Sequence, residues 1–251
     1  MNTPEAAQNT ALRLLLPLPS LRSAKLLGGT ALARCYLKHR VSYDLDFFLP
    51  EGFDPNELAV SMKAAGIRAK PLEIVKDASK ANQWHGFLVL PEGNLKVSFI
   101  QDSYYDVFAA VNKNLDGILV KTETVEGLFH RKLLTVSHPS PDGKTATGGR
   151  QTARDLFDLW VLSQAVMPIR KLIASLPYDY PEDAFIDGLD GMPWFDLSSD
   201  LAATLANKKW AAGKDVEIVR KYLYAQFGIK IEMGEGDINP DASGKPRKPA
   251  P

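Results

Sequence analysis

Two aspartates, two positions apart, offer the clearest chemistry in this sequence. Asp44 and Asp46 lie in a segment rich in aromatic and branched residues, which is typical of a β-strand and is closed by Pro50. Residues two apart on a strand project from one face, with Cα atoms about 6.5–7 Å apart. Two carboxylates so placed repel each other unless a cation lies between them. Since magnesium is bound by one or two carboxylates and shared with substrate phosphates, the pair predicts a magnesium site.

A glycine pair stands shortly before these aspartates. Gly28 and Gly29 precede a segment with helical spacing, residues 30–39, for which Thr30 is a suitable N-cap. Free backbone N–H groups and the positive end of a helix both suit a phosphate. Alone, a Gly-Gly pair is usually a turn, and an Asp-x-Asp pair is usually a solvated strand end. Their combination in one twenty-residue unit favours a site that grips a triphosphate and its metal.

The elements that must position these residues follow from hydrophobic spacing and turn residues. Short helices are expected at 11–16 and 58–65, and strands at 41–49, 67–75, 86–90 and 95–100. Residues 91–94 (Pro-Glu-Gly-Asn) have the chemistry of a hairpin turn. A helix, a strand, a helix and then a run of strands predict an α/β or α+β sheet domain over residues 1–118.

Beyond residue 118 the sequence becomes mainly helical. Helices are expected at 124–137, 151–166, 172–176, 197–212 and 215–227, with loops at 138–149 and 177–194. We therefore predict a helical domain over residues 119–233. Residues 234–251 contain four prolines and three glycines, a composition that cannot bury enough apolar surface to fold, so they are expected to form a disordered tail.

Composition excludes several classes of protein. The chain has 251 residues and balances 30 basic against 30 acidic side chains, so net charge does not indicate a nucleic-acid partner. The single cysteine, Cys35, excludes an internal disulfide and any multi-cysteine zinc site. No apolar run approaches the roughly 20 residues of a membrane span or reads as a signal peptide. A cytoplasmic protein without a membrane partner is expected.

The motifs resemble those of a known family. Gly28-Gly29-Thr30-Ala31-Leu32 and the string from Arg40 to Phe48 resemble the first motif of the nucleotidyl transferase AbiEii/AbiGii toxin family, within the DNA polymerase β-like nucleotidyltransferase superfamily. Lys96-Val97 stands at the second motif and Lys132-Leu133 at the third. Arg150 and the Arg-Asp-x-x-Asp-Leu segment from Arg154 match the closing motif. The order and spacing hold from about residue 26 to 165.

The resemblance implies a nucleotidyltransferase-like mixed sheet with flanking helices, followed by a mainly helical domain that completes the active-site cleft. It implies Mg²⁺ held by Asp44 and Asp46. The other catalytic residues would be Lys132, Asp155 and Asp158, and the nucleotide would be bound by Gly28, Gly29, Thr30, Ser42, Lys132, Arg150 and Arg154. An alternative for Asp155 and Asp158, neighbours on one helix face, is that they fix Lys132 or Arg150. Arg131 and Lys132 differ by 100° around a helix, so only one of them is expected to face the cleft.

The resemblance also implies partners. Family members are toxin-like components of type IV toxin–antitoxin or phage-defence systems, so it implies transfer of a nucleotide from a nucleoside triphosphate to an acceptor such as the tRNA 3′ end. A cognate antitoxin protein is implied in the same way.

One position departs from the superfamily pattern. A third carboxylate normally completes the metal site and acts as the base, but here the string reads Lys96-Val97-Ser98. Serine is no base at neutral pH, and losing a general base costs on the order of 10²–10⁴ in rate. Asp102 can replace it only if the strand ends early and the chain folds back. The alternative is a catalytically weakened protein that acts by binding a nucleotide or a partner.

Overall fold

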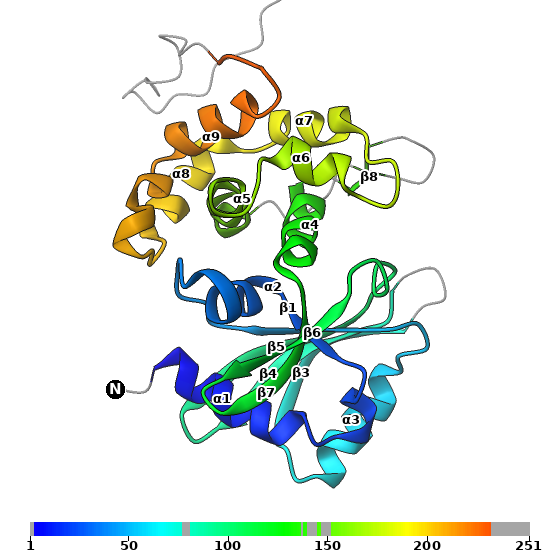
Figure 1. Cartoon of the computed structure of the whole chain (residues 1–251). Coiled ribbons are helices and arrows are strands. Elements are labelled where there is room, and N and C mark those ends of the chain that lie inside the picture. Colours follow the sequence, from blue (N-terminus) through cyan, green and yellow to red (C-terminus); the bar gives the residue numbers. More distant parts are fainter. Residues whose placement is uncertain (1–2, 77–80, 137, 140–144, 147–151, 232–251) are drawn as a thin grey trace, which may run out of the picture.

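The computed structural model describes residues 3–76, 81–136, 138–139, 145–146 and 152–231. The chain forms two parts (Figure 1): a sheet with its helices, built from the first half of the sequence, and a group of helices that stands over one face of that sheet. This arrangement confirms the predicted fold class, a mixed sheet with flanking helices followed by a mainly helical region.

The main sheet has five strands in the order β1-β2-β5-β4-β3. They are β1 (Lys25–Leu27), β2 (Leu45–Leu49), β3 (Ala69–Val75), β4 (Gln83–Leu90) and β5 (Gly93–Gln101). β2 and β5 are parallel, and the other neighbours are antiparallel. In β2 the alternation is as predicted: Leu45, Phe47 and Leu49 are buried in the core, while Asp46 and Phe48 are half-buried on the opposite face.

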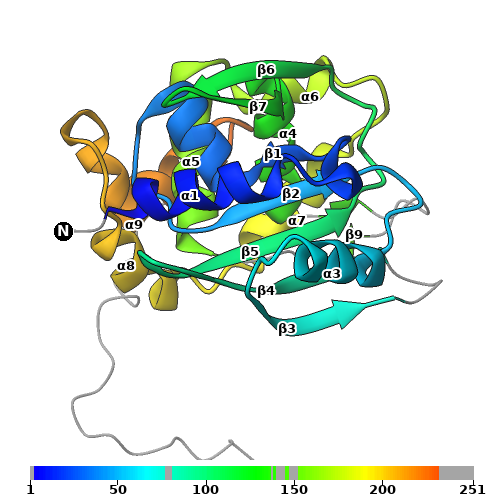
Figure 2. The same ribbon diagram turned by 90° about the horizontal axis from the view of Figure 1, so that it is seen from below.

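Helices cover both faces of this sheet. α1 (Pro4–Leu15) and α3 (Pro55–Ala64) lie against the face away from the helical part (Figure 2). α2 (Gly28–Ala31) continues without a break into the π-helical segment Leu32–Leu37, beneath the helical part. α2 begins at Gly28, so the prediction that Thr30 caps this helix is wrong: the glycine pair is its first turn.

A two-stranded hairpin, β6 (Ala110–Leu115) and β7 (Ile118–Glu123), was not predicted. Its turn residues Asp116 and Gly117 both have left-handed backbone angles, φ 50° and 82°. An Asp-Gly pair in such a turn matches the twist of a hairpin, so the signal was present in the sequence. A domain boundary at 118/119 would separate the two paired strands. We therefore propose that the boundary lies after β7.

The helical part begins after this hairpin. Its helices are α4 (Val125–Val136), α5 (Ala153–Ala165), α6 (Ile169–Ala174), α7 (Glu182–Asp190), α8 (Trp194–Ala203) and α9 (Val216–Ala225). α7 lies inside the segment 177–194 that was expected to be a loop, and its buried residues Phe185 and Leu189 explain why it folds. Trp194, Trp210 and Tyr224 are buried and pack the helices against one another, whereas Phe195 is exposed.

The helix expected at 197–212 is interrupted. α8 ends at Ala203, and the chain then runs extended beside the segment that precedes Asp44. Val41 N–H donates to Leu205 O (3.0 Å), and Asn207 N–H donates to His39 O (2.7 Å). A 3₁₀ segment, Lys208–Lys214, follows. These hydrogen bonds join the chain after α8 to the segment that leads into β2.

Some expectations fall outside the described residues, namely the tail 234–251 and Arg150. The short ladder of β8 (His138–Pro139) and β9 (Thr145–Ala146) lies within the segment 138–149, which was expected to be a loop. Among the described residues, no helix is both long and apolar enough to cross a membrane.

Candidate active site

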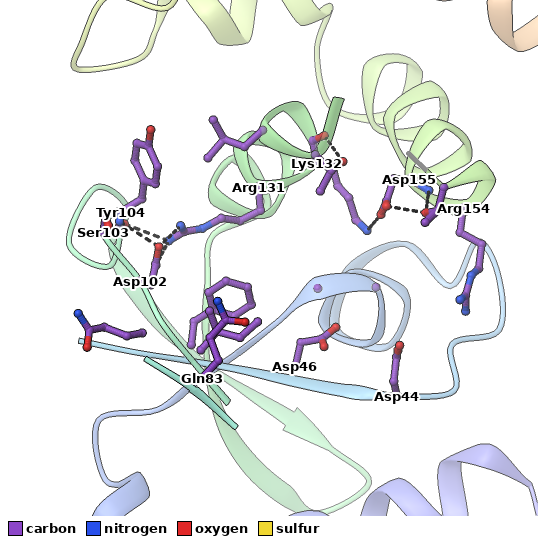
Figure 3. Close-up of a pocket in the computed structure, with 18 of the residues that line it drawn as sticks. Asp44, Asp46, Gln83, Asp102, Ser103, Tyr104, Arg131, Lys132, Arg154 and Asp155 are labelled. Carbon is purple, nitrogen blue, oxygen red and sulfur yellow. Dashed lines mark hydrogen bonds and ion pairs between the residues drawn. The ribbon is translucent and has the colours of Figure 1, made fainter. Parts of the chain in front are cut away.

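A cavity of about 430 Å³ lies between the sheet and the helices α4 and α5. Its floor is the sheet face that carries Asp46 and Phe48, and its roof is α4 together with the start of α5 (Figure 3). Most of the residues expected in the site line it, namely Gly28, Gly29, Asp44, Asp46, Lys132, Arg154 and Asp155. The structure therefore brings motifs more than a hundred residues apart to one space.

Asp44 is held in place by buried polar side chains. Thr30 Oγ1 donates to the backbone oxygen of Asp44 (2.5 Å), and Ser42 Oγ donates to Asp44 Oδ1 (3.4 Å). Gln8 Nε2 donates to Ser42 O (2.9 Å). Thr30 and Ser42 are buried and are not among the residues that line the cavity. In this structure they position Asp44, and their predicted contact with the nucleotide stays a prediction.

The glycine pair, Gly28 and Gly29, lies close to β2. Gly28 has φ +68°, and a Cβ there would lie 2.5 Å from Asp46 Oδ2. A Cβ on Gly29 would lie 2.5 Å from Arg40 Nη2. Glycine is required at Gly28 both by its backbone angle and by this close approach. The pair brings the first turn of α2 to the carboxylate of Asp46, as a joint metal and phosphate site requires.

Lys132 reaches from α4 towards the start of α5. Its Nζ lies 2.5 Å from Asp155 Oδ1 and 2.8 Å from Asp158 Oδ2. Thr152, the N-cap of α5, donates from Oγ1 to Asp155 Oδ2 (2.5 Å). Burial lowers the pKa of Lys132, but the two carboxylates outweigh it and the pKa is raised. Lys132 therefore stays protonated beside the cavity.

Asp158 lies behind the cavity wall. Its side chain is fully buried and is bonded by Arg40 Nε (2.6 Å), Arg40 Nη2 (2.8 Å) and His39 Nε2 (2.7 Å) as well as by Lys132. Burial raises its pKa, but Lys132 and Arg40 hold that pKa well below its ordinary value. Asp158 is not among the residues that line the cavity. This placement favours the alternative role, fixing Lys132, over direct contact with a ligand.

Arg131 points the other way along α4. It forms a bidentate pair with Asp102 (2.8 and 2.7 Å) and also pairs with Glu123 (2.8 Å), which in turn lies 3.4 Å from Lys25. Arg131 and Lys132 both line the cavity, so the expectation that only one faces the cleft is wrong. The reason is reach: two long side chains leave the helix in opposite directions along the same cavity (Figure 3).

Ser98 occupies the position at which the superfamily pattern has a third carboxylate. Ser98 on β5 is the register partner of Asp46 on β2, and it is buried. β5 ends at Gln101, where Asp102 N–H donates to Leu49 O (2.9 Å). β5 thus runs one residue past its expected end, so the condition for Asp102 to replace the missing base is not met. Asp102 does line the cavity, but its carboxylate is engaged by Arg131.

The donor set of the cavity suits magnesium. Among the described residues, no group of three or more histidine, cysteine, aspartate or glutamate side chains is placed to hold a metal. Magnesium does not need one, because it keeps several waters and takes phosphate oxygens from its substrate. Asp44 and Asp46, on one wall beside the glycine pair, are the residues that would hold it.

Sequence reasoning missed other residues of the cavity. Gln83, Tyr104 and Leu134 line it, and none belongs to a recognised motif. Gln83 and Phe48 lie opposite the same residue of β5, Ile100, and only the strand register shows this.

The chain matches the family model described as "Nucleotidyl transferase AbiEii toxin, Type IV TA system" over residues 24–212. No curated protein matches it. The solved structures similar to it include JHP933 from Helicobacter pylori, at 20% identity over 91% of this chain and 97% of that one, with a TM-score of 0.45. Another is an antigenic nucleotidyltransferase-like protein from Paracoccidioides brasiliensis, at 16% identity over 80% and 94%, with a TM-score of 0.43.

Proposed function

Because the chain belongs to the AbiEii nucleotidyl transferase toxin family of type IV toxin–antitoxin systems, we propose that it transfers a nucleotide from a nucleoside triphosphate to an acceptor. The transfer depends on magnesium, and the acceptor is the 3′ end of a tRNA. A cognate antitoxin protein restrains it.

The observation that carries this proposal is the arrangement around one cavity. Asp44, Asp46 and the glycine pair form its floor, with Lys132 and Arg154 on the opposite side. Mg²⁺ at the two carboxylates would offset phosphate charge and favour the ionised form of the attacking hydroxyl. The backbone of Gly28 and Gly29 approaches the phosphates, and the first turn of α2 supplies N–H groups there.

Lys132 is suited to the leaving phosphates. Its ammonium group is a compact point charge, which suits phosphate oxygens. Asp155 and Asp158 keep it protonated and fix its direction. Preorganised charge of this kind stabilises the charge that builds up on the transferred group, without reorganisation during the reaction.

Ser98 favours a second candidate, a nucleotide-binding protein whose transfer step is weak. At the register partner of Asp46 there is no carboxylate to take the proton of the attacking hydroxyl. Asp102 reaches the cavity but is engaged by Arg131. This candidate keeps the triphosphate and magnesium site and lacks rapid transfer.

The deciding experiment follows label from each of the four α-labelled triphosphates into tRNA or into the protein, with Mg²⁺. We expect transfer with at least one triphosphate, and an Asp46→Asn variant that loses it by 10²-fold or more. Asp179→Asn, in an exposed loop position, is the matched control and keeps full activity. Magnesium-dependent binding without transfer of any of the four would favour the second candidate. The same pair of variants tests toxicity, since expression of the parent should slow growth and Asp46→Asn should relieve it.

A further inference from the structure

The cavity has a second end that the proposed reaction does not use. Beyond Asp46 the floor continues with Phe48 and Ile100, and Tyr104 and Leu134 add further apolar surface. Besides the paired charges of Asp102 and Arg131, the polar groups here include Ser103 and the amides of Gln83 and Gln101. Figure 3 shows Tyr104, Asp102 and Arg131 at this end, away from Asp44 and Arg154.

The charges at this second end cancel. Arg131 is shared between Asp102 and Glu123, and Glu123 also lies near Lys25, so two cations face two carboxylates. Its bidentate bond to Asp102 fixes the plane of the guanidinium group. That group lies 5.6 Å from the ring centroid of Phe48 and 6.0 Å from that of Tyr104. This end therefore offers flat surfaces, a guanidinium plane and two aromatic rings, against which a flat ligand can lie.

Gln83 supplies directional recognition at this surface. Its Oε1 lies 2.7 Å from His85 Nε2, and because an amide oxygen only accepts, His85 carries the proton on Nε2. His85 thereby fixes which way the amide faces and is a positioning residue. The NH₂ group of Gln83 is then the donor that this side chain offers a ligand, and Gln101 adds a second amide.

We propose that this second end is a nucleobase subsite, in which the base lies against Arg131, Phe48 and Tyr104 and is read by the amides of Gln83 and Gln101. Bases stack on aromatic rings and guanidinium planes, and amide side chains pair with their hydrogen-bonding edges. The subsite deepens the proposed function and rests on it.

The spacing along β2 supports the subsite. Asp46 and Phe48 are two residues apart on one strand, so their Cα atoms are about 6.5–7 Å apart. The phosphate end and the flat end are thus separated by about the width of one sugar. The base can belong to the incoming triphosphate or to the terminal nucleotide of the acceptor, since both present the same chemistry beside the reacting phosphate.

The test measures binding by the full chain with Mg²⁺, so its outcome does not depend on transfer. One arm titrates the non-transferable α,β-methylene analogues of ATP, GTP, CTP and UTP, with inorganic triphosphate as a probe that has no base. The other arm titrates single-stranded RNAs that differ only in their 3′ base. We expect the wild type to prefer one base in at least one arm, and Gln83→Leu to reduce that preference about 3- to 10-fold. Affinity for inorganic triphosphate should not change.

Two further variants make the result specific. Gln101→Glu exchanges a donor for an acceptor, so it should change which base is preferred. Gln164→Leu removes an exposed amide on α5 and should leave every preference unchanged. Loss of preference in the first arm assigns the subsite to the incoming nucleotide, and loss in the second assigns it to the acceptor. A wild type without base preference in either arm, or a preference that Gln83→Leu leaves intact in a folded variant, overturns the subsite. Failure of label transfer alone would overturn only the proposed reaction.

Discussion

Two neighbouring cations on α4 are held by opposite kinds of ion network. Lys132 shares its network with Arg40, and the two cations meet two carboxylates, Asp155 and Asp158, of which Asp158 is fully buried. Arg131 shares its network with Lys25, and these two meet Asp102 and Glu123. Both networks are balanced in charge. The first is centred on a carboxylate between sheet and helices, and the second on a guanidinium group.

The difference separates two tasks at one cavity. Asp158 receives Arg40, His39 and Lys132 at once, so its network fixes the helical part to the chain just before Asp44. Arg131 ties α4 to the end of β5 and to β7, and its planar group faces the second end of the cavity. The two networks therefore differ in geometry and not in net charge: one fixes an ammonium group near the two aspartates, and the other fixes a planar guanidinium group at the opposite end.

The largest effect should come from removing the central carboxylate. Asp158→Asn leaves Arg40 and Lys132 buried without their shared charge, which costs about 3–5 kcal/mol in the free energy of unfolding. Urea denaturation at pH 7 measures it. Glu182→Gln, which breaks an exposed pair with Arg170, is the control and should cost less than about 1 kcal/mol. A cost for Asp158→Asn no greater than that of the control would contradict the central role of Asp158.

Adjacent substitutions on α4 should separate the two networks. We expect Lys132→Met to reduce kcat for nucleotide transfer about 10²–10³-fold, because a charge aimed at the phosphates is lost. Arg131→Met removes the cation that pairs with Asp102 and Glu123. Its main effects should therefore be a lower Tm and a higher KM, with a smaller loss of kcat. Steady-state kinetics and thermal unfolding of both variants test this. Equal losses of kcat would show that the two cations share one task.

A smaller effect should appear on mild acidification, at His130, the residue before Arg131 on α4. Burial, and then the charge of Arg131, lower the pKa of His130 from 6.5 to about 3. Its Nε2 is hydrogen-bonded to the Tyr178 hydroxyl, which stays protonated because burial raises the pKa of Tyr178 to about 12. The folded-state pKa is depressed, so protonation favours the unfolded chain. The contribution of neutral His130 is complete above pH 6.5 and is lost as the pH falls from 6.5 towards 3.

At pH 5 this loss amounts to roughly 2 kcal/mol. Unfolding free energies of wild type and His130→Gln, compared at pH 7 and pH 5, measure it. The variant should lose less stability than the wild type over this interval. Equal losses of unfolding free energy in wild type and variant between pH 7 and pH 5 would show that His130 is not held neutral by its surroundings.

The sequence predicted the local features of the site well. Alternation in the strand placed Asp44 and Asp46 on one face, and the turn at 91–94 placed β4 beside β5. The missed hairpin β6–β7 carried its own signal, Asp116-Gly117, which short-range reasoning could have used. α7 was missed because the prolines and glycines around it are typical of a loop. The segment is nevertheless helical, and burial of Phe185 stabilises it.

Long-range features were beyond local patterns. Asp158 and Arg40 are 118 residues apart, and nothing in either neighbourhood selects the other. Helix periodicity placed Asp155 and Asp158 on one face but could not show that one lines the cavity while the other is enclosed. Gln83 entered the cavity only through the register of three strands.

The hydrogen bonds between residues 39–41 and 205–207 have a consequence for motion. They attach the chain that follows α8 to the segment that leads into Asp44. If the helical part rotated while these bonds remained, the segment before Asp44 would move with it. The cavity would therefore not widen on that side. Ligands would have to enter elsewhere along the cavity. The amide hydrogens of Val41 and Asn207 should therefore exchange with solvent slowly and together, at the rate of the buried strands.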